Sequence, residues 1–324
     1  MELKDKFGRK INYLRLSVTD RCNLRCTYCM PEQGLSFAKR ETVLSYEELL
    51  RLMDILGDLG ISKIRITGGE PFVRADLMYF LRELRKKPFL EAISITSNLT
   101  VIRPHVDELL DLGIRDVNVS LDALDRQKFF EITKRDKYEE VYLALMEMIE
   151  KGFNVKINCV VMKETNEDQV LPLLGLAKDH PVSVRFLEEM PFNGSGEARS
   201  KVMNYNEILS LISECYDYSP LIDAPSSTSK NYKIDGFAGS FGIIPSFSRT
   251  FCGDCNRLRL AATGEVRTCL YGGDELNLRD MLRSGKSDEI KEALIHAVGL
   301  KQKDGFAAAA ENEENYLSMT KLGG

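Results

Sequence analysis

Three cysteines near the start of the chain, Cys22, Cys26 and Cys29, form a C-x3-C-x2-C run. Thiolates are soft ligands, and three in one short loop suit an iron–sulfur cluster or zinc better than disulfides, which would leave one cysteine over. Structural zinc would want a fourth ligand, and none of the three histidines lies near the run. A [4Fe–4S] cluster held by three cysteines would leave one iron open to a small molecule. The run therefore predicts a reactive metal centre, with structural zinc as the alternative.

A second set of three cysteines lies toward the other end of the chain. Cys252, Cys255 and Cys269 have the spacing C-x2-C-x13-C, which again suits an iron–sulfur cluster. A zinc knuckle is the competing interpretation, although it too lacks a nearby fourth ligand. Cys159 and Cys215 fall in a strand-like and a helix-like segment, so we expect both to be buried structural thiols.

Short β-like runs alternate with longer helix-like stretches through the first 190 residues. The expected strands are 13–18, 63–67, 92–96, 116–121, 154–161 and 182–187. The expected helices lie near 46–59, 75–86, 105–112, 138–151, 167–178 and, past the last strand, 204–216. Six β–α repeats in series predict a parallel sheet with right-handed crossovers, curled into a full or partial barrel.

The expected strands alternate apolar and polar residues, and the polar face carries Arg15, Arg65, Lys156 and Arg185. Helices should cover the apolar face, which leaves the polar face to line the interior. Burying four cations there without partners would cost too much free energy. The pattern therefore predicts an open, wet cavity that holds an anionic ligand. A sheet with one solvated face is the alternative.

Composition narrows the class of protein. The 324 residues carry a net charge of -5, which argues against a general nucleic-acid binder. Eight cysteines without a secretion signal suggest metal ligands in a reducing compartment, and no apolar run nears membrane-spanning length, so we expect a cytoplasmic protein. A loop-like stretch at 190–196 indicates two regions, 1–189 and 190–324.

The first cysteine run, followed downstream by Gly68-Gly69-Glu70-Pro71, resembles the signature of the radical S-adenosylmethionine (SAM) family. With the second cysteine set in view, nearly the whole chain resembles the molybdenum-cofactor biosynthesis protein A family, the radical SAM GTP 3′,8-cyclases. The resemblance implies an α/β fold, a partial (β/α)6 TIM-like barrel of the radical SAM type with a C-terminal extension that holds a second iron–sulfur cluster.

The resemblance also implies site residues, assigned by motif. The metal ligands would be Cys22, Cys26, Cys29, Cys252, Cys255 and Cys269. The SAM contacts would be Tyr28, Gly69, Ser120 and Met190. The GTP contacts would be Arg15, Arg65, Thr96, Lys156, Arg185, Arg257 and Arg259, with the catalytic role falling to Arg257, Arg259 and Arg15. Gly323-Gly324 resembles a double-glycine tail that enters the active site, whereas Leu99 stands where the family has glycine.

The implied reaction is the first step of molybdenum cofactor (molybdopterin) biosynthesis. A 5′-deoxyadenosyl radical takes the 3′ hydrogen from GTP ribose, the C3′ radical adds to guanine C8, and reduction gives 3′,8-cyclo-7,8-dihydro-GTP. The implied cofactors are two [4Fe–4S] clusters and SAM. The implied partners are an electron donor such as a flavodoxin or ferredoxin and a downstream cyclic pyranopterin monophosphate synthase, without nucleic acid or membrane; the oligomeric state, a homodimer included, is open. A radical SAM peptide-modifying enzyme and a non-enzymatic iron–sulfur or zinc protein are the alternatives.

Overall fold

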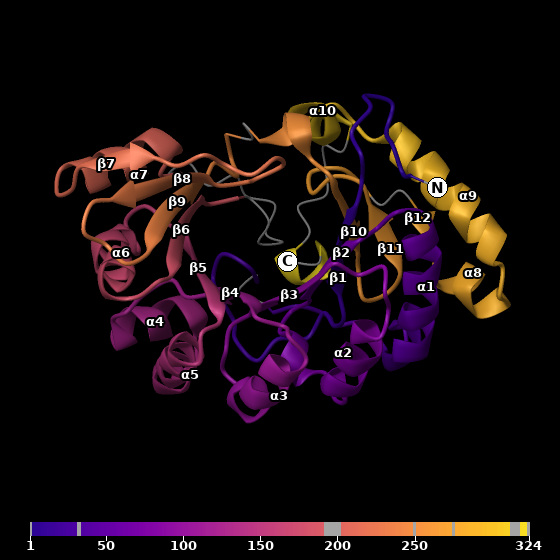
Figure 1. Cartoon of the computed structure of the whole chain (residues 1–324), viewed down its shortest axis with the longest axis horizontal. Helices are drawn as coiled ribbons and strands as arrows, with labels where there is room; N and C mark the ends of the chain where they lie inside the picture. Colours follow the sequence, from indigo (N-terminus) through magenta and orange to yellow (C-terminus); the bar gives the residue numbers. More distant parts are fainter. Residues whose placement is uncertain are drawn as a thin grey trace. The chain divides into compact units, whose positions relative to one another are not determined.

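The computed structural model (Figure 1) describes residues 2–30, 34–190, 202–248, 251–273, 276–311 and 318–322. The chain divides into two compact units, each assembled from separate stretches of sequence. Unit one contains Met1–Asn23, Gln33–Thr96 and Cys252–Gly324, and unit two contains Leu24–Glu32 and Ser97–Phe251. The first cysteine run is therefore divided, since Cys22 belongs to unit one and Cys26 and Cys29 belong to unit two.

The sheet of unit one has the strand order β12-β11-β10-β1-β2-β3. Its strands are β1 (Tyr13–Ser17), β2 (Lys63–Thr67), β3 (Ala92–Ser97), β10 (Arg257–Leu260), β11 (Glu265–Arg267) and β12 (Leu276–Asn277). β10, β1, β2 and β3 run parallel, whereas β11 and β12 continue the sheet in antiparallel fashion. A strand from the C-terminal part of the chain thus lies directly beside the strand that precedes the first cysteine run.

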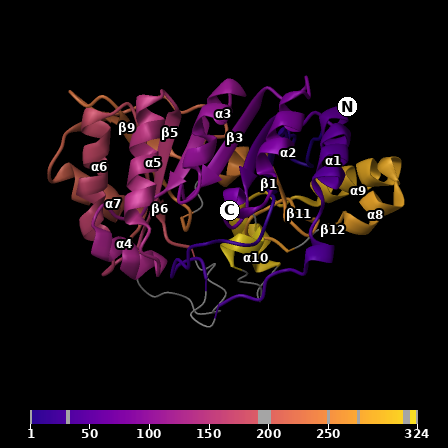
Figure 2. The same cartoon turned by 90° about the horizontal axis from the view of Figure 1, so that it is seen from below.

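Helices from both ends of the chain accompany this sheet. They are α1 (Tyr46–Asp58), α2 (Leu77–Arg85), α8 (Arg279–Ser284), α9 (Ser287–Leu300), α10 (Gly305–Ala310) and α11 (Met319–Leu322). α8 and α9 lie beside α1 in both views (Figures 1 and 2). Arg283 Nε donates to Glu48 at 2.8 Å, and Lys291 Nζ donates to Asp58 at the same distance. The C-terminal helices therefore pack onto the helix that follows the first cysteine run in the sequence.

The sheet of unit two has the strand order β4-β5-β6-β9-β8-β7. Its strands are β4 (Asp116–Ser120), β5 (Asn154–Val161), β6 (Ser183–Glu188), β7 (Tyr218–Pro220), β8 (Lys230–Ile234) and β9 (Ser240–Ile244). Its helices are α3 (Val106–Asp111), α4 (Arg126–Thr133), α5 (Tyr138–Glu150), α6 (Val170–Asp179) and α7 (Tyr205–Ser213). β4, β5, β6 and β9 are parallel, and β8 and β7 are antiparallel additions.

The alternation of apolar and polar residues is confirmed in the burial of both sheets. Leu14, Leu16, Ile64 and Ile157 are 0% exposed and belong to the core. Along β5, side chains on the other face, beginning with Lys156, are half-buried. Each fully buried aliphatic side chain stabilises the fold by about 1.5–3 kcal/mol. Burial of the apolar faces therefore sets the strand register, and the register in turn places the polar side chains on the opposite face.

All six strands expected in the first part of the chain are present as β1 to β6, with ends displaced by at most one residue. A capping box begins α1, since Ser45 Oγ accepts from the Glu48 N–H and a Glu48 carboxylate oxygen accepts from the Ser45 N–H. α4 and the strands after β6 were not predicted. Cys159 is buried as expected, but the prediction for Cys215 is wrong: that residue follows the end of α7 and is exposed. Among the described residues, no helix combines the length and apolar character needed to cross a bilayer.

Leu99, at the position where the resemblance implies a glycine, adopts a φ of +61°. This left-handed conformation costs a residue with a Cβ about 1–2 kcal/mol. The Leu99 side chain is 1% exposed, and its N–H donates to Ser97 Oγ at 3.0 Å. Since burying a leucine contributes about 1.5–3 kcal/mol, packing offsets the strain.

We therefore expect Leu99→Gly to lower the free energy of unfolding by about 1–3 kcal/mol, because the lost packing exceeds the strain relieved. Urea unfolding of both proteins measures the difference. Lys134→Gly is the matched control: Lys134 has a φ of +56° but an exposed side chain, so the same change there should be neutral or stabilising. A Leu99→Gly protein more stable than wild type would contradict this account.

Candidate metal centres and anion site

A row of four arginines crosses neighbouring strands of unit one. Arg15 on β1 pairs in register with Arg65 on β2 and with Arg259 on β10, and Arg259 pairs with Arg267 on β11. Residues directly opposite one another in a sheet point to the same face. The row therefore lies on the polar face, with Arg257 two residues before Arg259. Arg267 was missed from the sequence because β11 was not predicted as a strand.

The arginines of this row disfavour one another's charge. Burial, followed by the positive charge of Arg259, lowers the pKa of Arg15 well below its usual value. Burial and the charge of Arg257 lower the pKa of Arg259 to about 10. Arg65 Nε donates to the Tyr13 hydroxyl at 2.7 Å. A bound polyanion would relieve the repulsion, and guanidinium groups suit phosphate through bidentate hydrogen bonds.

The second cysteine set lies beside this row in the same unit. Cys255 precedes β10 and Cys269 follows β11, so the antiparallel β10–β11 pair brings the two cysteines to the same end of the hairpin. Cys252 begins the 3-10 helix Cys252–Asp254. Burial raises the pKa of Cys252, and the nearby charges of Cys269 and Cys255 raise it further. Cys252 therefore lies near enough to Cys255 and Cys269 for their charges to act on it; their joint role as metal ligands stays a prediction.

Two cations that the sequence did not single out hold the backbone around this set. Lys301, which is 2% exposed, donates through Nζ to the carbonyl oxygen of Thr268, next to Cys269, and to that of Arg257 at 3.4 Å. Arg9 Nη1 donates to the Cys252 carbonyl oxygen at 3.1 Å. Neither residue belongs to a motif that could be recognised in the sequence, because each contacts a segment that is distant along the chain.

The donor set fits an iron–sulfur cluster. Burial raises the pKa of Cys255, but the charges of Lys301 and Arg257 outweigh burial and lower it to about 7. The deprotonated thiolate is the form that binds metal, so a lowered pKa favours metal binding at neutral pH. Across the described ranges, no group of three or more His, Cys, Asp or Glu side chains is already arranged around a single metal position.

In unit two, Cys26 and Cys29 lie in a short turn. The N–H groups of Cys29 and Met30 both donate to the Cys26 carbonyl oxygen, each at 3.0 Å. The turn is anchored to the end of α4. Arg25 N–H donates to the Thr133 carbonyl oxygen at 2.9 Å, and Thr27 N–H donates to that of Ile132 at 3.0 Å. The unpredicted helix α4 therefore supports this stretch.

Tyr28, between these two cysteines, donates its hydroxyl hydrogen to Asp122 Oδ2 at 2.9 Å. Burial, followed by the negative charge of Asp122, raises the pKa of Tyr28 well above its usual value. Burial raises the pKa of Asp122 to about 6. Tyr28 therefore stays neutral and donates, and the carboxyl of Asp122 accepts. Asp122 was missed from the sequence, although a polar side chain just after a parallel strand is a usual site signal.

The Gly68-Gly69-Glu70 segment packs against the loop that carries Cys22, within unit one. Gly69 N–H donates to the Thr19 carbonyl oxygen at 2.7 Å, and Glu70 N–H donates to that of Arg21 at 2.8 Å. A Cβ on Gly69 would lie 2.2 Å from the Arg21 carbonyl oxygen. The glycines therefore permit a close approach of two backbones that no side chain would allow. The contact of Gly69 with SAM stays a prediction.

Arg74 ties together the two ends of the same loop. Its Nη1 donates to the Val18 carbonyl oxygen at 2.6 Å, and its Nη2 donates to the Leu44 carbonyl oxygen at 2.7 Å. The guanidinium also lies over the ring of Tyr46, 4.0 Å from its centroid. The base of the cysteine loop is thus closed by one side chain.

The remaining predicted residues fall in one unit or the other. Thr96 is half-buried near the end of β3 in unit one. In unit two, Lys156 Nζ forms an ion pair with Asp116 Oδ1 at 3.7 Å. Lys156 also lines a cavity of about 560 Å³. Ser120, Asn158 and Arg185 are paired across β4, β5 and β6. Met190 follows β6, and Gly323-Gly324 lies outside the described residues.

Models of two known families match successive parts of the chain. The model described as "Radical SAM superfamily" matches residues 16–177, and that described as "Molybdenum Cofactor Synthesis C" matches residues 182–306.

Curated relatives extend over most of the chain. A protein named GTP 3′,8-cyclase from Listeria monocytogenes is 38% identical, covering 99% of this chain and 99% of its own. The mitochondrial GTP 3′,8-cyclase of Arabidopsis thaliana is 39% identical over 94% of this chain and 79% of its own length. Molybdenum cofactor biosynthesis protein moc-5 of Caenorhabditis elegans is 41% identical over 92% of this chain but 50% of its own length. The chain spans about half the length of several such relatives.

Solved structures share the fold at low sequence identity. Streptococcus suis SuiB has a TM-score of 0.60 and 16% identity, covering 87% of this chain and 66% of its own. The protein anSMEcpe with bound AdoMet has a TM-score of 0.55 and 16% identity, covering 94% of this chain and 83% of its own. With the family matches, these likenesses confirm the expected fold class, an α/β partial barrel of the radical SAM type with a C-terminal extension.

Proposed function

Because the chain belongs to the radical SAM superfamily and, within it, to the GTP 3′,8-cyclase family, we propose that it converts GTP into 3′,8-cyclo-7,8-dihydro-GTP. This would be the first step of molybdenum cofactor biosynthesis. The observation that carries the proposal is the row of Arg65, Arg15 and Arg259 in register beside the second cysteine set. Arginines crowded on one face in this way, half-buried or buried, suit the binding of a polyanion.

Cys22, Cys26 and Cys29 would hold the cluster that binds SAM. When bound, the cluster and SAM supply a 5′-deoxyadenosyl radical that removes the 3′ hydrogen of the GTP ribose. The chain's own part is positional. Gly69 keeps the Cys22 loop against the end of β1, and Tyr28 is fixed by its bond to Asp122. Ser120 and Met190 complete the proposed SAM contacts.

The arginine row would bind the triphosphate and orient the ribose and guanine. Arg15, Arg65 and Arg259 offer several guanidinium donors on one face, which suits the negative charges of three phosphates. Lys156, Arg185 and Thr96 are further proposed GTP contacts. Arg257 and Arg259 lie on β10, two and four residues after Cys255, so they would contact substrate close to the second metal centre.

We propose that Cys252, Cys255 and Cys269 hold a second [4Fe–4S] cluster next to the substrate. Three thiols with neighbouring cations support this assignment. The regions 1–189 and 190–324 are proposed as the parts carrying the two clusters, and the family matches to residues 16–177 and 182–306 support that division. A flavodoxin or ferredoxin as electron donor and a cyclic pyranopterin monophosphate synthase as consumer of the product complete the proposal.

Replacing Lys301 by methionine is expected to lower the iron content toward half, because Lys301 fixes the backbone next to Cys269 and Arg257. Iron is measured per protein after anaerobic reconstitution. Lys291→Met on α9 is the control, since its ion pair with Asp58 is at the surface and contributes little. Full iron in the Lys301→Met protein would contradict the supporting role of Lys301.

The proposed function is tested under anaerobic conditions with reconstituted, reduced protein and SAM. 5′-Deoxyadenosine is measured with GTP, with ATP and without nucleotide. We expect production that depends on GTP and yields a cyclised guanine product. Production that ignores the nucleotide would refute the cyclase and point to a peptide substrate. Zinc in place of iron, with no product, would refute the radical chemistry itself.

A further inference from the structure

The carboxylate of Asp122 joins the Cys26–Cys29 stretch to the sheet of unit two. The residue is 4% exposed and follows the end of β4. Its Oδ2 accepts the hydrogen bond from the Tyr28 hydroxyl at 2.9 Å, and its Oδ1 accepts from the Val160 N–H on β5 at 2.9 Å. One side chain therefore uses each of its oxygens for a different element.

The backbone of Asp122 is itself held in place by Asn166, which is 0% exposed. Asn166 Nδ2 donates to the Asp122 carbonyl oxygen at 2.9 Å and to that of Val160 at 3.0 Å. Asn166 Oδ1 accepts from the Met162 N–H at 2.8 Å. A buried amide with three such bonds is a rigid support.

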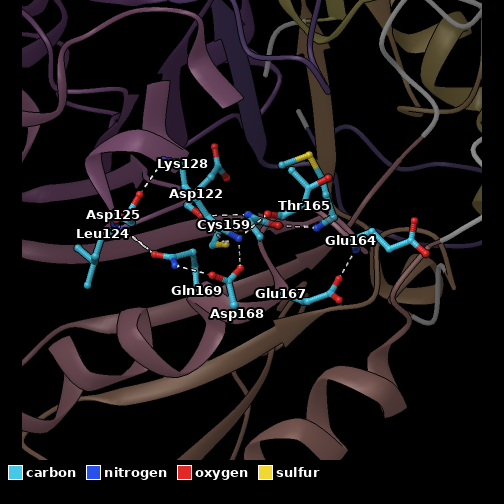
Figure 3. A network of polar contacts seen from close by, with 12 residues as sticks. Asp122, Leu124, Asp125, Lys128, Cys159, Glu164, Thr165, Glu167, Asp168 and Gln169 are labelled. Atoms are coloured by element: carbon cyan, nitrogen blue, oxygen red, sulfur yellow. Dashed lines mark hydrogen bonds and ion pairs between the residues drawn. The ribbon is translucent and has the colours of Figure 1, made fainter. Parts of the chain in front are cut away.

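The segment just after Asp122 is fixed by a second buried amide (Figure 3). Gln169 Oε1 accepts from the N–H groups of Leu124 at 3.1 Å and Asp125 at 3.2 Å. Asp125 in turn begins α4 by accepting from the Lys128 N–H at 2.8 Å. The network thus leads from β5 through Asp122 to the helix whose C-terminal end anchors the cysteine turn.

We propose that Asp122 is a positioning residue for SAM binding, acting through Tyr28. The backbone bonds from Arg25 and Thr27 place the turn, but they do not set the side-chain torsions of Tyr28. The bond to a fixed carboxylate holds the hydroxyl end of the ring, so the ring between the two cysteines is preorganised before SAM arrives. This inference rests on the proposed radical SAM function only in taking SAM as the ligand beside Tyr28.

The test is the affinity of the reconstituted protein for SAM, measured anaerobically by calorimetry without GTP. Tyr28→Phe removes one oxygen and keeps the ring, so the fold should be intact. We expect SAM to bind about tenfold more weakly, as for loss of a hydrogen bond to a charged group, with iron content unchanged. Tyr142→Phe on α5 is the matched control and should bind SAM as wild type does.

Asp122→Asn gives the second arm. An amide has one acceptor oxygen where the carboxylate has two, so the bonds to Val160 and Tyr28 cannot both be kept as they are. We expect weaker SAM binding, and the Tyr28→Phe/Asp122→Asn double variant should be no weaker than the weaker single one, because both remove the same interaction. The spectrum of the reduced cluster should respond less to SAM in each variant.

Unchanged SAM affinity in Tyr28→Phe, or additive effects in the double variant, would overturn the proposal. Loss of iron in Tyr28→Phe would also overturn it, since the bond would then serve to retain the cluster. Because no nucleotide is present, a failure of the proposed GTP chemistry would leave these results unaffected and would be recognised separately.

Discussion

Replacing Arg257 by alanine is expected to abolish cyclisation of GTP while leaving the iron content unchanged. Arg257 is 8% exposed on β10, and its Nη1 lies 4.0 Å from Cys255 Sγ. It therefore belongs both to the cationic face and to the surroundings of the second thiol set. Removing a charged donor that contacts the reacting substrate costs roughly 10²–10³-fold in turnover. Product formation and iron per protein, both measured anaerobically, check this expectation.

The control for Arg257→Ala is Arg51→Ala, which removes an exposed arginine on α1 and should leave both quantities unchanged. If the Arg257→Ala protein lost iron together with activity, Arg257 would be a structural support of the cluster and not a substrate contact. Wild-type turnover in Arg257→Ala would contradict the assignment of the substrate site to this face.

Gly69→Ala is expected to have the second large effect, on the first metal centre. The new Cβ would lie 2.2 Å from the Arg21 carbonyl oxygen, a distance that backbone atoms cannot accept without moving. The loop carrying Cys22 would have to shift away from the end of β1. We therefore expect loss of the iron held by the first cysteine set, seen as a fall in iron toward half, and loss of at least 10²-fold in 5′-deoxyadenosine production.

Gly175→Ala on α6 is the matched control for Gly69→Ala. A Cβ at Gly175 meets no atom within 4 Å. Alanine also favours a helix over glycine by about 0.5–1 kcal/mol, so this variant should be slightly more stable, with full iron and activity. A Gly69→Ala protein with full iron would show that the two backbones are not packed as described.

The strands that carry the site were predictable because local signals agree with one another. The period of two in β1, β2 and β5 marks both the apolar core face and the polar face that includes Arg15, Arg65 and Lys156. Glycines with positive φ, such as Gly60 and Gly152, close the preceding helices where the sequence placed those ends. Hydrophobic burial then confirms the same register.

The parts that could not be predicted depend on pairings between distant segments. β10 was not predicted as a strand, since its Arg257–Leu260 stretch has few residues and pairs with β1 across most of the chain length. Arg9 donates to the carbonyl oxygen of Cys252 and Lys301 to that of Arg257, and such backbone contacts leave no motif in the sequence. These contacts become visible only when the chain is folded.

Gly69 and Leu99 illustrate two different physical requirements on a backbone position. Gly69 is required because a second backbone lies against it. Leu99 has a positive φ, and there the buried side chain compensates for the strain. A residue with a side chain can thus take a position that requires only a positive φ, whereas a position closely approached by another backbone requires glycine.

We expect this chain to remove the 3′ hydrogen of GTP held on the arginine row. The most direct measurement uses GTP labelled with deuterium at C3′, with unlabelled SAM and reduced protein, and determines the label in 5′-deoxyadenosine by mass spectrometry. We predict that 5′-deoxyadenosine carries deuterium from this substrate and none from GTP labelled at other ribose positions. Unlabelled 5′-deoxyadenosine from the C3′-labelled substrate would contradict the account.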